Sequence, residues 1–283
     1  MSYTSYFYLL FFLGVLVALY YLMPLKKRWL VLLGGSYFFY WLASGKLIVF
    51  LLITTVSVYL GALVMEREQQ AFDSVRKSLE KEERKARKAV MMRRKRHIVF
   101  AMVLINVGLL AFLKYYHFFS ANINALGSHL EPGFQLPALK LLMPLGISFY
   151  TLSAVGYVID VYRGEVKAQR NFWYMLLYIS FFPQLIAGPI VKYRDIAQQI
   201  LERKETVEKF AAGVMRFCWG LGKKVLLANA FAEVVDDIFQ YGPEAVSRKA
   251  LWLGAVLYML QIYYDFSGYS DMAVGLGKMF GFQ

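Results

Sequence analysis

Cysteine and charge are scarce in this sequence, and each scarcity excludes a class of protein. The single cysteine, Cys218, excludes an internal disulfide framework. Only 18% of the 283 residues are charged, whereas 59% are hydrophobic and 17% are aromatic. This balance is typical of a membrane protein with several spans rather than of a soluble one. Residues 1–25 contain no charge and so lack the basic start of a cleavable signal peptide, which predicts a retained first span.

The sequence also lacks the short motifs of familiar catalytic sites. It contains no G-x-S-x-G elbow, no metal-ligand spacing and no glycine-rich phosphate loop, so no metal site is predicted. Histidine is the usual general base near neutral pH, and the chain has three: His97, His117 and His129. Each is interpreted as an interfacial or loop residue rather than a base.

Long apolar runs are what the sequence has in abundance. A transmembrane helix needs roughly 20 mostly apolar residues. Two apolar regions, 210–232 and 250–281, are interrupted by charged side chains. The pattern predicts an all-α, polytopic transmembrane protein, with residues 1–283 forming a single membrane domain. The six uncharged runs are 1–25, 29–45, 47–65, 98–113, 141–159 and 171–191.

Basic residues gather between these runs. Segment 66–97 holds 12 Lys or Arg against 6 Asp or Glu, a net charge of +6. Lys and Arg mark cytoplasmic loops, so this segment is predicted to be a basic, cytoplasmic helical insert. Because the positive charge of the chain lies between apolar runs, it indicates contact with anionic lipid headgroups and not with nucleic acid. The composition of the insert favours a solvated helix over a dedicated binding element.

The run 171–191 carries basic residues on both flanks, so both of its ends are expected on the cytoplasmic side. Pro183 and the Gly188-Pro189 pair interrupt its helical pattern. Backbone groups freed at membrane depth must be satisfied by protein or by a water-filled cavity. These features predict a broken, re-entrant segment that lines a cavity. A straight span with a proline kink is the alternative.

The last apolar region places Asp265 and Asp271 at expected membrane depth, which makes them functional candidates. On a regular helix they lie about 120° apart, so one acid–base pair is not expected. The alternative is structural, with either carboxylate capping a broken helix end or pairing with a lysine. Lys223 and Lys224 are interpreted as snorkelling to an interface. Close helix packing is predicted for the small residues Ser267, Gly268, Gly275, Gly277 and Gly281, which include a G-x-x-x-G at 277–281.

Five segments resemble the membrane-bound O-acyltransferase family, and its alginate O-acetyltransferase-like bacterial branch in particular. The resemblance implies a multi-pass protein of the bacterial inner membrane. It also implies transfer of an acyl group from acetyl-CoA or another thioester to an exported polysaccharide, with periplasmic or extracellular acetylation partner proteins. D-alanyl transfer to teichoic acid is a related alternative, and a membrane transporter is one of another class. The segments are FLKYYHFF (112–119), MPLGISFYTLSAVGYVIDVYRGE (143–165), SFFPQLIAGPIVKYRD (180–195), GLGKKVLLA (220–228) and YYDFSGYSDMAVGLGKMFGF (263–282).

The resemblance also implies where functional residues lie. The two characteristic histidines of the family follow the Asp-Phe-Ser-Gly-Tyr-Ser-Asp motif, so they are expected beyond Gln283 and the chain resembles an N-terminal portion. No catalytic residue is therefore assigned within it. Residues matching the family motifs are expected to form the scaffold and wall of a substrate tunnel: Pro183, Gln184, Gly188, Pro189, Asp265, Ser267, Gly268, Tyr269 and Asp271.

Overall fold

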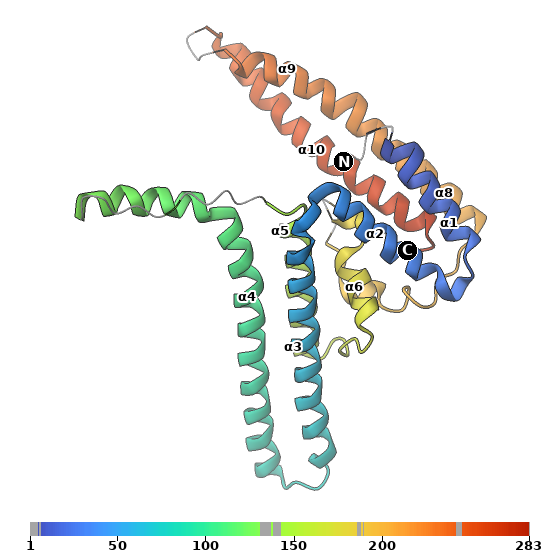
Figure 1. The fold of residues 1–283 in the computed structure, drawn as a ribbon, viewed down its shortest axis with the longest axis vertical. Helices are drawn as coiled ribbons and strands as arrows, with labels where there is room; N and C mark the ends of the chain where they lie inside the picture. The colour runs from blue at the N-terminus through green and yellow to red at the C-terminus, as the bar shows by residue number, and fades with distance from the viewer. Residues whose placement is uncertain are drawn as a thin grey trace. The chain divides into compact units, whose positions relative to one another are not determined.

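Every regular element in the computed structural model of the protein is a helix, over the residues that the structure describes. These are 5, 7–130 (backbone only for 127–130), 137, 143–185, 188, 190–241 and 245–282. The predicted all-α class is confirmed (Figure 1).

Contacts divide the chain into two compact units. The central unit comprises Ser36–Ser180 and Lys192–Asp195, and the terminal unit comprises Met1–Gly35, Phe181–Val191 and Ile196–Gln283. The single membrane domain over 1–283 stays a prediction.

The central unit is built on a long helical hairpin. Helices α3 (Ile48–Val75) and α4 (Lys81–Leu130) lie side by side, and α5 (Ile147–Arg163) packs against both (Figure 1). The short α6 (Phe172–Ser180) contacts α3 and α5. Helix α2 (Arg28–Ser44) and the 3₁₀ turn η3 (Gly45–Leu47) precede the hairpin, and α2 is shared between the two units.

The basic insert at 66–97 is helical, but it is two helix ends rather than one helix. Helix α3 continues to Val75, and α4 begins at Lys81 after a turn in which the Ser78 amide donates to the Val75 carbonyl at 3.1 Å. Glu82 and Glu83 stand in the first turn of α4, where carboxylates complement the positive end of the helix dipole. The insert is therefore the tip of the α3–α4 hairpin.

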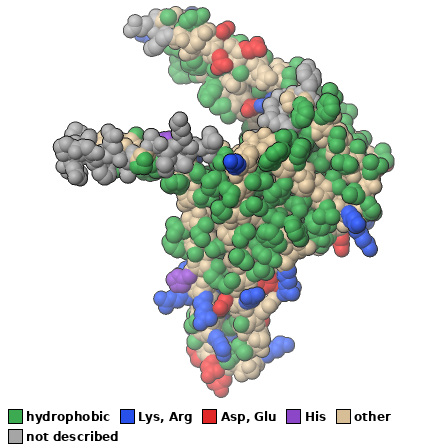
Figure 2. All heavy atoms as spheres, in the orientation of Figure 1, with side chains coloured by type: hydrophobic (Ala, Val, Ile, Leu, Met, Phe, Trp, Pro, Cys, Tyr) green, Lys and Arg blue, Asp and Glu red, His purple; other side chains and the backbone are tan. Residues whose placement is uncertain are grey.

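Apolar side chains are exposed along the arms of this hairpin. On α3 they recur every three or four residues, opposite a buried face that includes Leu51 and Val58. Figure 2 shows hydrophobic side chains over the arms and charged ones at the tip. Within the described residues two helical stretches, Leu25–Val75 and Lys81–Leu126, are long and apolar enough to cross a membrane. The exposed residues on α3 are Val49, Ile53, Val56, Leu60 and Val64.

The run 171–191 is not one straight helix. Helix α6 has 9 residues, which extend about 14 Å at the usual rise and so fall short of a bilayer core of about 30 Å. The chain leaves helix after Ser180 and forms the 3₁₀ turn η4 (Phe182–Gln184) around Pro183. The predicted break near Pro183 is confirmed, whereas Pro189 lies outside the described residues.

Two antiparallel helical arms dominate the terminal unit. One arm runs through α8 (Val207–Gly222), the π-helical segment η5 (Lys223–Ala228) and α9 (Asn229–Phe239). The other is α10 (Arg248–Met279), which packs along all three (Figure 1). The remaining elements are η1 (Phe7–Phe12), α1 (Leu13–Leu22), η2 (Leu25–Lys27) and α7 (Tyr193–Ile196), the last shared between the units.

Facing glycines let α8 and α10 approach at backbone distance. A Cβ on Gly220 would lie 2.5 Å from the carbonyl oxygen of Gly268, and one on Gly275 would lie 2.7 Å from that of Gly213. Such small-residue contacts allow two helices to cross closely. The packing role predicted for Gly268 and Gly275 is confirmed.

The G-x-x-x-G at 277–281 has a different role from the predicted one. Helix α10 ends at Met279, and Gly281 has a left-handed φ of +84°. The Phe282 amide donates to the Gly277 carbonyl at 2.9 Å, and the Gly281 amide donates to the Lys278 carbonyl at 3.0 Å. This is a Schellman cap, which requires the left-handed residue that glycine supplies. The prediction of a helix-packing motif here was wrong.

Candidate functional site

Two motifs far apart in the sequence meet inside the terminal unit. The Tyr269 hydroxyl, on α10, donates a buried hydrogen bond of 2.9 Å to the carbonyl oxygen of Pro183 in η4. A break in a helix leaves carbonyls without their usual donors, and a buried carbonyl must find one elsewhere. Tyr269 supplies that donor, so the irregular segment is fixed against α10.

Gly188 packs into the same contact. A Cβ at this position would lie 3.0 Å from the Cα of Gln184 and 3.5 Å from Cε1 of Tyr269. Phe182 is fully buried, and its ring meets Phe12 edge-on at 5.5 Å between centroids. Four of the predicted wall residues, Pro183, Gln184, Gly188 and Tyr269, therefore form one closely packed surface.

Three other predicted residues of α10, Asp265, Ser267 and Asp271, belong to a row of polar and charged side chains facing α8 and η5, which we call the charge ladder. Asp271 accepts hydrogen bonds from Arg216 Nε at 3.0 Å and from Lys223 Nζ at 2.6 Å. Lys223 also donates to Ser267 Oγ at 3.1 Å. Lys224 forms a separate ion pair with Asp265. The ladder thus joins three cations of one arm to two carboxylates of the other.

The contacts of the ladder distinguish between the functional and the structural interpretations of Asp265 and Asp271. Asp265 and Asp271 have different partners, which confirms that they do not form one acid–base pair. Both pair with a lysine, as the structural alternative proposed, but neither caps a broken end because α10 is continuous around them. Lys223 and Lys224 reach across to α10 instead of extending alone to an interface. The snorkelling interpretation did not anticipate these partners.

Arg216 is a member of the ladder that sequence reasoning missed. It lies seven residues before Lys223, and a spacing of seven returns to the same helix face. That spacing, opposite a carboxylate in a neighbouring apolar helix, was the available signal. The close approach at Gly220 and Gly268 brings both side chains within reach of Asp271.

A second cluster was also missed, at the start of the terminal unit. Glu205 forms an ion pair with Arg28 and a hydrogen bond with the Tyr20 hydroxyl. Arg203 Nε donates to the same hydroxyl at 3.1 Å, and its guanidinium lies 4.7 Å from the ring centroid of Phe282. Sequence reasoning assigned neither arginine to a site. Their side chains are nearly buried, so the cluster anchors the chain around α1 to the end of α10.

Helix α8 begins with a side-chain cap. The Thr206 hydroxyl accepts from the Lys209 amide at 3.2 Å. Hydrogen bonds from its own backbone amide and from Thr206 lower the pKa of the exposed Glu208. This carboxylate therefore stays ionised at the positive end of the helix dipole.

The histidines lie apart from these groups. His97 and His117 are exposed on α4 in the central unit, and the side chain of His129 lies outside the described residues. Among the residues that the structure describes, no group of three or more His, Cys, Asp or Glu is placed to hold a metal ion.

Comparison with known proteins gives a family match over part of the chain. Residues 165–283 match the family model of the membrane-bound O-acyltransferases, a range that includes η4, the charge ladder and the Tyr269–Pro183 contact. Over this range the chain is similar to the membrane-bound O-acyltransferase family. The resemblance seen in the sequence is confirmed.

Three relatives illustrate the range of the family. The probable alginate O-acetylase AlgI of Pseudomonas syringae pv. tomato is 43% identical over 64% of this chain and 34% of its own length. The peptidoglycan O-acetyltransferase of Helicobacter pylori is 34% identical over 63% of this chain and 38% of its own. The teichoic acid D-alanyltransferase of Bacillus subtilis is 28% identical over 54% of this chain and 39% of its own length. The chain spans about a third of the length of the curated relatives it matches.

Proposed function

We propose that the protein is a membrane-bound O-acyltransferase that moves an acetyl group to hydroxyls of an exported polysaccharide. The observation that carries the proposal is the family match over residues 165–283, together with 43% identity to an alginate O-acetylase. In such a transfer the hydroxyl oxygen attacks the thioester carbonyl, the carbon–sulfur bond breaks, and a base takes the hydroxyl proton. The products are an O-acyl ester and a free thiol. Acetyl-CoA or another thioester is the proposed donor.

The proposed location is the bacterial inner membrane, crossed several times. Exposed apolar side chains on α3, α4 and α10 support it, because a soluble protein would bury faces of this size. The 9-residue α6 and the basic residues flanking 171–191 support a re-entrant path for that run.

The proposed role of the η4–α10 surface is to form one wall of the acyl-transfer chamber. Tyr269 is a positioning residue in this proposal, because it acts by holding the Pro183 backbone. The charge ladder holds α8 and η5 against the same helix. No residue of this chain is proposed as the base.

Transfer of D-alanine to teichoic acid is the second candidate, supported by the relative at 28% identity. The O-acetyl-transferring relatives are more similar to this chain, at 43% and 34% identity, which favours acetyl transfer. The family match likewise favours a transferase over a transporter.

A donor-choice assay tests the proposal. Membrane vesicles containing the full-length protein are incubated with a polysaccharide acceptor and either radiolabelled acetyl-CoA or a D-alanyl-charged carrier protein. The expected result is alkali-labile label on the polysaccharide from acetyl-CoA alone. Label from the D-alanyl carrier alone would support the second candidate, and label from neither donor would contradict both.

A further inference from the structure

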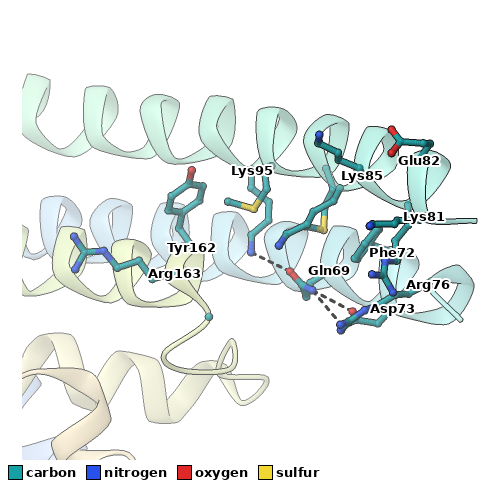
Figure 3. Close-up of a pocket in the computed structure, with 15 residues that line it drawn as sticks. Gln69, Phe72, Asp73, Arg76, Lys81, Glu82, Lys85, Lys95, Tyr162 and Arg163 are labelled. Atoms are coloured by element: carbon teal, nitrogen blue, oxygen red, sulfur yellow. Dashed lines mark hydrogen bonds between the residues drawn. The ribbon is translucent and has the colours of Figure 1, made fainter. Parts of the chain in front are cut away.

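A pocket of about 860 Å³ opens at the tip of the α3–α4 hairpin, within the central unit (Figure 3). Helix α3 and its C-cap line it from Gln69 to Arg76, α4 lines it from Lys81 to Lys95, and the end of α5 adds Tyr162 and Arg163. The residues recur every three or four positions on α3 and α4, so each helix presents one face to the hollow. The volume lies in the range of small-molecule sites.

The pocket is strongly cationic. Its lining has seven Lys or Arg against two carboxylates, Asp73 and Glu82. Outside the pocket, Arg94 of the same helix pairs with Glu68 of α3 at 3.3 Å. Within the described part of the chain, no carboxylate lies in salt-bridge range of the pocket cations on α4. These cations are Lys81, Arg84, Lys85, Lys88 and Lys95.

The pocket face of α4 carries repelling charges at close spacing. Lys81 and Lys85 are four residues apart, as are Arg84 and Lys88, and like charges at this spacing destabilise a helix. A bound anion with more than one negative charge would relieve the repulsion.

Lys95 is buried at the inner side of the pocket. Only 3% of the surface of this residue is exposed. Its Nζ donates a hydrogen bond of 3.3 Å to Oε1 of the neutral Gln69 side chain (Figure 3). The ammonium also lies 5.8 Å from the ring centroid of Tyr162. Gln69 in turn donates to Asp73 at 3.2 Å, which fixes its oxygen toward Lys95. An ammonium has three donors, and only one has a hydrogen-bond partner here among the described residues.

Apolar and aromatic side chains complete the lining: Phe72, Met91, Met92 and Tyr162. Phosphate oxygens would form charge-assisted hydrogen bonds with the cations. A nucleobase or a hydrocarbon portion of the same ligand would pack against the apolar and aromatic side chains. We infer that this pocket binds a phosphate-bearing ligand, with Lys85 and Lys88 near its rim and Lys95 at its inner side. Two sources share this chemistry: the diphosphate of a free nucleotide-type molecule and the headgroup of an anionic phospholipid. The inference does not depend on the acyl-transfer proposal.

Charge-matched variants of the whole chain in phosphatidylcholine nanodiscs test the inference. The pocket variant is Lys85→Gln/Lys88→Gln. The control is Arg87→Gln/Arg93→Gln, which removes the same charge from exposed positions of α4 that do not line the pocket. The probes are ADP and inorganic pyrophosphate, measured by calorimetry. A second arm measures the phosphatidylglycerol retained by each protein from mixed-lipid nanodiscs, by native mass spectrometry.

The expected result is saturable binding that the pocket variant weakens about tenfold or more and the control less than about twofold. A selective loss for ADP and pyrophosphate assigns the pocket to a free phosphate compound. A selective loss of retained phosphatidylglycerol assigns it to a lipid headgroup. Equal weakening in both variants, or no saturable binding of any probe, would overturn the inference.

A third variant, Lys95→Met, tests the role of the cation at the inner side of the pocket. It should weaken binding of the same probe at least as much as the pocket variant. Circular dichroism and thermal unfolding report whether the variant still folds, because Lys95 is buried. If it does not fold, Lys85 and Lys88, both exposed, still decide the outcome.

Discussion

The two charged regions of this chain use their cations differently. In the charge ladder each of the three cations, Arg216, Lys223 and Lys224, contacts a carboxylate of α10. At the hairpin tip, five cations of α4 surround a pocket with no carboxylate in salt-bridge range among the described residues. Paired charges between closely packed helices fix a structure, whereas unpaired charges around a hollow are available to a ligand. The two regions contain the same types of basic residue, so what distinguishes the scaffold from the proposed binding surface is whether each cation has a carboxylate partner.

Breaking the helix crossing beneath the ladder should have the largest effect. In Gly220→Ala the new Cβ meets the Gly268 carbonyl and the Met272 amide at 2.5 and 2.6 Å, and both are backbone atoms that cannot turn away. We expect a loss of about 2–3 kcal/mol in the free energy of unfolding. Gly222→Ala, two residues along, has no neighbour within 4 Å and is the control. Equal stability of the two variants would contradict the crossing.

Removing a carboxylate should have a smaller effect that depends on the number of partners. Asp271→Asn leaves Arg216 and Lys223 without their anion, and we expect a loss of about 1–2 kcal/mol. Asp265→Asn affects one pair whose carboxylate side chain is 53% exposed, and we expect less than about 1 kcal/mol. Chemical unfolding in detergent measures both. The reverse order would show that the ladder is not centred on Asp271.

A change at the start of α8 leaves the ladder intact and gives a reference for the size of these losses. Thr206→Ala removes the N-cap, which should cost about 1 kcal/mol. The lowered pKa of Glu208 adds a pH-dependent contribution that is present at neutral pH and is lost as pH falls through the pKa of the folded state. Unfolding at neutral and acidic pH should therefore show a smaller difference between variant and parent in acid. A difference that grows in acid would contradict the cap.

Removing cations at the hairpin tip should have the smallest effect on stability, and of the opposite sign. Without ligand, Lys85→Gln/Lys88→Gln should leave the free energy of unfolding unchanged or raise it by a few tenths of a kcal/mol, because like charges are removed. Thermal unfolding at low ionic strength measures it. A loss above about 1 kcal/mol would show that the tip, like the ladder, has structural pairs.

Much of the helical fold could be predicted from the sequence, because long apolar runs and proline breaks act locally. The end of α6 before Pro183 and the helical nature of 66–97 are examples. The hairpin at 76–80 was missed because its helix-forming composition gives no local stop signal. The G-x-x-x-G was misread because a glycine repeat inside a helix and a glycine cap just beyond it have the same letters.

The candidate site was less predictable, since it depends on which elements pack together. Asp265 and Asp271 were identified as candidates because a charge in an apolar segment is energetically costly. The helical period predicted that their side chains point in different directions. Their cationic partners could not be assigned before α8 was placed against α10. Glu205 and Arg28 lie far apart in sequence, and neither interrupts an apolar run, so nothing local linked them.

Acetyl transfer by a wall variant tests the central claim most directly. Tyr269→Phe removes only the hydroxyl that holds the Pro183 carbonyl, and Tyr258→Phe removes one from an exposed position on the same helix. Membrane vesicles with equal amounts of each protein are given labelled acetyl-CoA and polysaccharide. The account predicts a kcat lowered at least about tenfold for Tyr269→Phe, with Tyr258→Phe close to the parent. Equal transfer by all three proteins would contradict the assignment of the η4–α10 surface to the acyl-transfer chamber.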